Sequence, residues 1–94
     1  MQIVFEWDAG KARVNWRKHQ ISFDEALTVF NDDLARIFPD PDHSSEEFRE
    51  LIVGYSLLAR LLFVSFVEKP SGRVRIVSAR KATRRERENH EEDA

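Results

Sequence analysis

Two arginines, Arg60 and Arg80, are the strongest candidates in this sequence for binding a negatively charged group. They lie at the ends of two apolar segments, 60–68 and 73–80, whose residue pattern is typical of β-strands. Two guanidiniums side by side repel each other unless an anion or an acid lies between them. A bound phosphate would accept charge-assisted hydrogen bonds from both guanidiniums. The pair is therefore predicted to bind a phosphate and to stabilise the charge that it gains in a transition state. Glu86 is the alternative partner, and in that case the pair is structural.

The turn between the two segments decides whether the arginines meet. Pro70 fixes φ at about −65°, which excludes the two-residue hairpin turns that need a positive φ there. We therefore predict a three-residue loop, with a type I turn at 70–71 and Gly72 in the left-handed region. Lys69 then lies opposite Arg73, and even-numbered residues of both strands share one face. The further pairs of this register are Phe66 with Ile76, Val64 with Ser78, and Leu62 with Arg80. The two arginines come out diagonally adjacent on one face.

A second group of candidates lies on a predicted helix over 9–19. Lys11, Asn15 and Lys18 fall on one face of this helix. His19 is a candidate general acid or base, because an unperturbed imidazole titrates near neutral pH. Lys18 is a candidate phosphate contact or proton shuttle. The structural alternatives stay open, because a basic residue at a helix C-terminus also interacts favourably with the helix dipole.

Positive charge is concentrated in two segments, although the net charge is only −2. Residues 9–20 hold four basic residues and no acid, and residues 73–87 hold seven of the fifteen basic residues with one acid. This distribution predicts a basic face that binds a polyanion, or else a solvated helix with many salt bridges. The residues expected to contact the phosphates of such a polyanion are Lys11, Arg73, Arg75, Lys81, Arg84, Arg85 and Arg87.

The hydrophobic pattern predicts one α+β domain over 1–94 with the order β-α-α-β-β-β-β-α, in which an antiparallel sheet is combined with two N-terminal helices and a C-terminal helix. The expected elements are strand 2–7, helix 9–19, a helix within 21–30, strands 34–38, 51–55, 60–68 and 73–80, and helix 84–92. The last three strands follow one another too closely for crossover helices, so they should form an antiparallel meander. The run "LLFVSFV" is apolar at odd and at even positions alike, so both faces of the strand are apolar. This predicts a central strand covered on both faces. Expected helix caps are Asp8, Ser22 with Glu25, and Thr83 with Glu86.

Several functional classes find little support in the sequence. The absence of cysteine excludes a disulfide and a thiol nucleophile. The N-terminus lacks the pattern of a signal peptide, and the longest apolar run is too short to span a bilayer, so we expect a cytoplasmic protein with no membrane contact. Asp40, Asp42 and His43 have weak metal-ligand spacing in a turn-rich segment. We expect no metal and no cofactor.

Four segments of the chain resemble the BrnT family of toxins from bacterial type II toxin–antitoxin systems. They are "FEWDAGKARVNWRKHQISFDEALTVFND", "PDPDHS", "ARLLFVSF" and "RVRIVSARKATRRERE". The resemblance implies a small RelE-like ribonuclease that inhibits translation by cutting RNA. It also implies a BrnA-type antitoxin with a ribbon-helix-helix DNA-binding module, so that both proteins together repress their operon and reach operator DNA through the antitoxin.

The sequence departs from this family at loop positions. Gln20 and Ala59 stand where the family commonly has glycine, and Ala9 replaces a frequent proline at a first helical position. We expect Gln20 to occupy a left-handed helix end at a cost of about 1–2 kcal/mol. The resulting hypothesis is a metal-independent endoribonuclease that uses the 2′-hydroxyl of RNA as nucleophile, with Lys18, His19, Arg60 and Arg80 as catalytic residues. The expected polyanion is then RNA, bound by the basic residues named above, and the alternative for some of them is contact with the antitoxin. The alternatives are a non-catalytic nucleic-acid-binding or co-repressor module, and an inactive member of the family.

Overall fold

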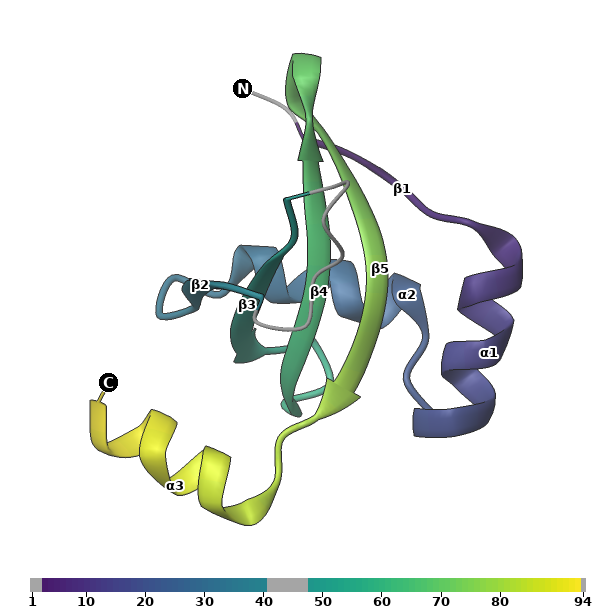
Figure 1. The fold of residues 1–94 in the computed structure, drawn as a ribbon. Helices are drawn as coiled ribbons and strands as arrows, with labels where there is room; N and C mark the ends of the chain where they lie inside the picture. The colour runs from purple at the N-terminus through teal and green to yellow at the C-terminus, as the bar shows by residue number, and fades with distance from the viewer. Residues whose placement is uncertain (1–2, 41–47, 94) are drawn as a thin grey trace.

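The computed structural model describes residues 3–40 and 48–93, which fold as one α+β domain (Figure 1). The strands are β1 (Val4–Glu6), β2 (Arg36–Pro39), β3 (Glu50–Tyr55), β4 (Leu61–Lys69) and β5 (Arg73–Lys81). The helices are α1 (Ala9–His19), α2 (Phe23–Ala26), α3 (Arg84–Asp93) and the 3-10 turns η1 (Leu27–Asn31) and η2 (Pro70–Gly72). The predicted element order is confirmed. Among the described residues, no helix is long and apolar enough to cross a membrane.

The five strands form a single sheet in the order β1-β5-β4-β3-β2. Strands β2 to β5 are an antiparallel meander with β4 at the centre, as its two apolar faces predict. The short strand β1 differs from the expectation, because it pairs parallel to β5 at the sheet edge and makes the sheet mixed. Strand β1 leaves the second half of β5 without a strand neighbour on that side, and α1 lies there instead (Figure 1).

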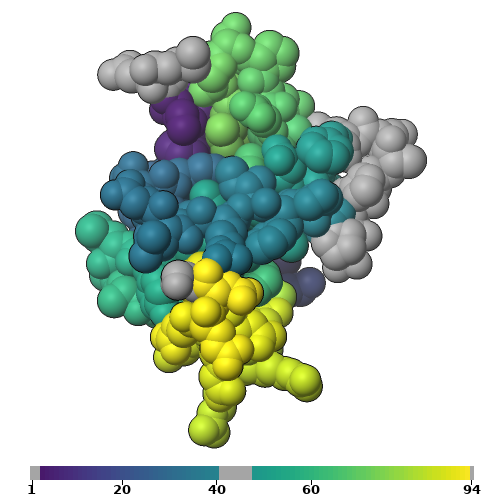
Figure 2. Space-filling model, turned by 90° about the vertical axis from the view of Figure 1, so that its left-hand side faces the viewer, coloured from purple at the N-terminus to yellow at the C-terminus, as the bar shows by residue number. Residues whose placement is uncertain are grey.

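The hydrophobic core lies between the sheet and the α2–η1 segment, which crosses behind the sheet in Figure 1. The core side chains include Ile21, Phe23, Ala26 and Val29 from the helical side, and Leu62, Val64, Phe66, Val74, Ile76 and Ala79 from the strands. Helix α3 packs against the opposite face, where Tyr55 donates to Glu91 at 3.0 Å and contacts His90 edge-on. In Figure 2, α3 (yellow) lies below the blue segment that contains β2, and Arg36 of β2 pairs with Asp93 there.

A β-bulge in β5 makes the predicted register wrong beyond its first half. Lys69 pairs with Arg73 and Phe66 with Ile76, as expected, but Ser65 pairs with Ser78 and leaves Val77 as an extra residue. Beyond the bulge, the observed pairs are Val64 with Ala79, Phe63 with Arg80 and Leu62 with Lys81. Because side chains alternate along a strand, one extra residue moves Arg80 to the face opposite Leu62 and Val64.

The hairpin turn has the predicted length but a different conformation. Ser71 and Gly72 both adopt positive φ, of 66° and 74°, so a type I turn at Pro70–Ser71 is wrong. Gln20 caps α1 at φ 59°, as predicted, and its backbone N–H and side-chain amide both donate to the carbonyl of Trp16. Ala59 keeps the left-handed conformation at φ 61°, in a turn where its N–H donates to Ser56 at 2.8 Å. Gln20 and Ala59 therefore both carry backbone strain.

We expect Ala59→Gly to stabilise the protein. Ala59 is exposed, so the glycine relieves the left-handed strain and removes no packing; the gain should be about 1 kcal/mol, or about 4–8 °C in Tm. Thermal unfolding followed by circular dichroism measures it. Ala9→Gly is the matched control, because Ala9 is exposed within α1, and there glycine should lower stability or leave it unchanged. A lower Tm for Ala59→Gly would contradict the assigned turn.

Candidate active site on the open face of the sheet

Asn15 joins α1 to the free edge of β5. Its amide nitrogen donates to the carbonyls of Ala79 at 2.9 Å and Ile21 at 3.0 Å, and its oxygen accepts from the Ala79 N–H at 3.0 Å. The side chain is almost completely buried. It makes the two hydrogen bonds to the backbone of Ala79 that a neighbouring strand would otherwise make. This fixes the C-terminal end of α1 beside the residues that follow the bulge.

A cavity of about 420 Å³ lies on the face of the sheet opposite the core, beside this junction. His19 at the end of α1 and Arg80 of β5 both line it, so the structure brings together two of the four predicted catalytic residues. The remaining lining residues are Asp40, Arg49, Leu51, Phe63, Ser65, Ser78, Ala79 and Glu86. Ser65 and Asp40 form a buried part of the wall, where the serine hydroxyl donates to the carboxylate at 2.8 Å.

Arg80 is held in a fixed orientation in this cavity. Glu86 accepts two parallel hydrogen bonds from its guanidinium, at 2.8 and 3.0 Å, and the Phe63 ring lies 4.4 Å from the guanidinium carbon. The hydrogen bonds from Arg80 lower the pKa of Glu86 to about 2, against the opposing effect of its burial, with help from the backbone of Thr83. Glu86 also completes the predicted capping box with Thr83, at 2.8 and 3.1 Å. Arg80 therefore has the acidic partner that the sequence offered as the structural alternative.

The structure separates Arg60 from Arg80, contrary to the predicted pair. Arg60 bonds through two nitrogens to Glu25 of α2, on the core-facing side, and Ser56 donates to the same carboxylate at 2.7 Å. The Glu25 side chain is only 6% exposed, and its hydrogen bond to Arg60 lowers its pKa despite burial. Arg60 does not line the cavity that holds Arg80. The bulge at Val77 is the physical reason, because it moves Arg80 to the other face.

Arg49 enters the same cavity, a contact that the sequence analysis missed. It immediately precedes β3, and strand alternation places it on the side of Leu51, which also lines the cavity. Its Nε is buried, and no atom in the described residues accepts a hydrogen bond from it. The sequence carried no signal for this contact, because Arg49 stood in an acidic segment outside the predicted strands.

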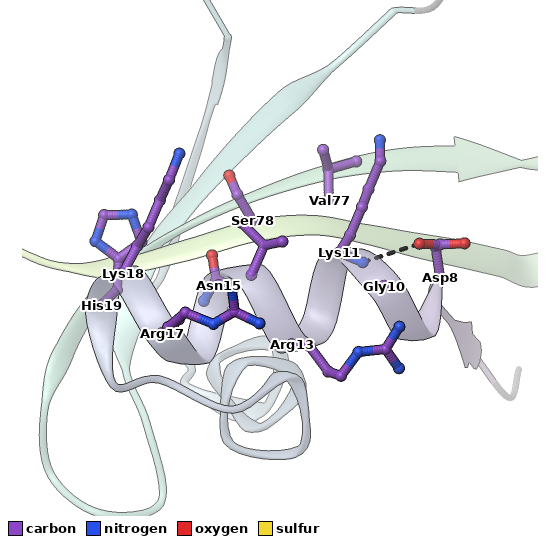
Figure 3. Close-up of a pocket in the computed structure, with 11 residues that line it drawn as sticks. Asp8, Gly10, Lys11, Arg13, Asn15, Arg17, Lys18, His19, Val77 and Ser78 are labelled. Atoms are coloured by element: carbon purple, nitrogen blue, oxygen red, sulfur yellow. Dashed lines mark hydrogen bonds between the residues drawn. The ribbon is translucent and has the colours of Figure 1, made fainter.

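A second hollow, of about 540 Å³, lies along α1 and shares His19 and Ser78 with the first cavity. Figure 3 shows Lys11 and Lys18 extending from α1 on the side of Ser78. Lys11 and Lys18 therefore share one side of α1, as predicted, whereas the side chain of Asn15 points inward to β5. Lys18 lies at the rim shared with His19 rather than in the cavity of Arg80.

The other predicted RNA contacts are arranged in two groups. Arg73 and Arg75 flank Glu6 of β1, at 3.2 and 3.4 Å, so the charge of this pair is partly compensated. Lys81, Arg84, Arg85 and Arg87 are exposed around the start of α3. The Arg84 side chain is 95% exposed and makes only a 3.4 Å pair with Glu88. The second group is thus open to a polyanion.

The predicted weak metal-ligand cluster lies only partly within the described residues. Asp42 and His43 lie outside the described residues, and Asp40 is engaged with Ser65. Within 3–40 and 48–93, no three acidic or histidine residues are grouped closely enough to hold a metal ion.

We expect Glu86→Gln to lower the free energy of unfolding by about 1–2 kcal/mol at pH 7, since both partners are partly exposed and solvent screens their attraction. The folded-state pKa is depressed, so the stabilisation is present above pH 4.5 and is lost as the pH falls toward 2. Urea unfolding of both proteins across this range measures the difference. Glu88→Gln, in an exposed pair, is the control and should change stability by less than about 0.5 kcal/mol. A difference that is constant from pH 7 to 2 would contradict the ion pair.

Comparison with known proteins gives the family of the chain. Residues 7–86 match the model of the family described as "Ribonuclease toxin, BrnT, of type II toxin-antitoxin system". A crystal structure of the Brucella abortus ribonuclease toxin, BrnT, matches with a TM-score of 0.69 and 21% sequence identity, over 88% of this chain and 100% of that one. This likeness confirms the predicted α+β fold. No match is found among curated proteins. Because the family match spans most of the sequence, the chain belongs to the BrnT family of ribonuclease toxins of type II toxin–antitoxin systems.

Proposed function

We propose that the chain is a metal-independent endoribonuclease whose active site is the cavity between His19 and Arg80. The observation that carries the proposal is that one cavity holds an imidazole, a fixed guanidinium and a second arginine, on the face of the sheet that the core leaves open. A ribonuclease of this type needs a group that moves protons and cations that stabilise charge on phosphate. RNA supplies the nucleophile, which is the 2′-hydroxyl next to the scissile phosphate.

The reaction would proceed by attack of the 2′-oxygen on phosphorus. Neutral His19 accepts the proton of the 2′-hydroxyl while the new P–O2′ bond forms and the P–O5′ bond breaks. The leaving 5′-oxygen takes a proton from water or from the Lys18 ammonium at the rim of the site. Arg80 donates to the phosphate oxygens, where negative charge builds up. The products are a 2′,3′-cyclic phosphate and a 5′-hydroxyl end.

The exposed basic residues around the start of α3 would hold the RNA on either side of the cleaved bond. Exposed arginines such as Arg84 contact phosphates without reading sequence. They bring RNA to the cavity because Glu86, which lines it, lies in the first turn of α3. A BrnA-type antitoxin with a ribbon-helix-helix module would inhibit the toxin by covering this basic face and the cavity. In that complex, operator DNA is contacted through the antitoxin.

A second candidate function is binding without catalysis, as a co-repressor with the antitoxin. The two-point pair between Arg80 and Glu86 favours it, because an arginine already neutralised by an acid has a structural role of its own. The two functions differ in one measurement, namely whether purified protein cleaves RNA.

We expect His19→Ala and Arg80→Ala each to lower the cleavage rate by about 100-fold, the usual effect of removing one group that acts in the transition state. Wild-type cleavage should continue in EDTA and should fail on RNA with a 2′-methoxy group at the scissile position. Rates on a labelled oligonucleotide, measured well below each variant's Tm, provide the test. Arg36→Ala, outside the cavity, is the control and should keep wild-type activity. Cleavage of the 2′-methoxy substrate, or loss of activity on chelation, would exclude the mechanism.

The double change of Arg84 and Arg85 to Gln should weaken RNA binding and lower the slope of log K against log salt by about 1.4, the value for two lost contacts to a single strand. Stability should change by less than about 1 kcal/mol, because both side chains are exposed. Fluorescence anisotropy with uncleavable RNA at several salt concentrations measures the slope. The double change of Arg36 and Lys69 to Gln removes the same charge elsewhere. An equal loss of affinity in this control would show that net charge alone matters, and unchanged affinity in the first variant would assign the two arginines to another partner.

A further inference from the structure

The positive charge of Arg49 is not neutralised by any of the other described residues that line the active-site cavity. Its Nε is buried without an acceptor in the described part of the chain, and no acid there forms an ion pair with it. A buried donor without a partner costs about 1–3 kcal/mol, and more when it belongs to a charged group. Such an atom at a cavity wall marks a place where a ligand completes the hydrogen bonding.

The two acids of the cavity are both engaged elsewhere. Glu86 accepts two hydrogen bonds from Arg80, and Asp40 accepts one from the hydroxyl of Ser65. The Asp40 backbone holds Arg49 in place, because its N–H donates to the Arg49 carbonyl at 3.0 Å. The backbone of Arg49 is therefore held beside Asp40, while no acid among the described residues neutralises its guanidinium, whose charge is left for a group that enters the cavity.

The Arg80–Glu86 pair carries no net charge, so on its own it is a poor counter-ion for a phosphate. A pentacoordinate phosphate carries one more negative charge than the diester from which it forms, and a further cation is needed to stabilise it. Arg49 is the other guanidinium that lines this cavity within the described residues. Ser78, exposed on the sheet beside Ser65, adds a hydroxyl to the same wall.

We propose that Arg49 and Arg80, with Ser78, form the site that binds the scissile phosphate diester, with Arg49 as the cation that stabilises the charge gained in the reaction. The proposal rests on the ribonuclease function proposed above and replaces the Arg60–Arg80 clamp expected from the sequence. Arg49 is thereby a catalytic residue, because its guanidinium contacts the reacting phosphate.

The test combines cleavage with phosphate binding in the full chain. Arg49→Ala should lower the single-turnover cleavage rate by about 100-fold, and Arg49→Lys should recover part of it. Added guanidinium ion should rescue Arg49→Ala and should not affect Arg36→Ala, whose arginine lies outside the cavity. Binding of inorganic phosphate, measured by calorimetry, should weaken at least fivefold in Arg49→Ala and remain unchanged in Arg36→Ala.

These readouts separate the two proposals. A cleavage rate within twofold of wild type in Arg49→Ala would overturn the role of Arg49 and leave the ribonuclease proposal in place. A slow rate without guanidinium rescue and with unchanged phosphate binding would show a structural role, and would also overturn it. If the wild-type protein cleaves no RNA, the phosphate-binding comparison still decides: weaker binding in Arg49→Ala supports the anion site, and equal binding contradicts it.

Discussion

The side-chain amide of Asn15 is the interaction on which the active-site geometry depends. It replaces a strand at the free edge of β5, and through three hydrogen bonds it ties α1, Ile21 just beyond the helix cap, and Ala79 together. A buried amide that satisfies three backbone groups cannot be exchanged for an apolar residue without leaving those groups unpaired. His19 lies four residues after Asn15 on α1, and Arg80 follows Ala79 on β5. The same amide therefore sets the relative position of the imidazole and the guanidinium.

The bulge at Val77 adds the second constraint, since it determines which face receives Arg80. Without the extra residue, Arg80 would point to the core side, where Arg60 already neutralises Glu25. With it, Arg80 packs on Phe63 and pairs with Glu86 at the mouth of the open cavity. A bulge next to an active site is a common way to direct one side chain to the other face of a strand. The two faces of the sheet thereby have separate roles, one for the core and one for the chemistry.

Much of the fold could be predicted because it depends on local signals. The caps at Asp8 and Thr83, the apolar run of β4 and the short connections between strands fixed the helices and the meander. The face of Arg80 could not be predicted, because the turn sequence sets only the first pairs of the hairpin, and no local pattern marks the bulge at Val77. Arg49 was missed for a related reason: its role depends on which residues of the sheet face the cavity, which no local pattern records.

The proposed place of RNA cleavage is the cavity between His19 and Arg80. A crystal structure of the chain with an oligonucleotide that carries a 2′-methoxy group at the cleavage site tests it most directly. We expect the scissile phosphate to lie in that cavity, within hydrogen-bonding distance of Arg80, with the modified 2′-oxygen facing His19. A phosphate bound on the core-facing side near Arg60, or bound to the exposed arginines of α3 with the cavity left open, would contradict the account.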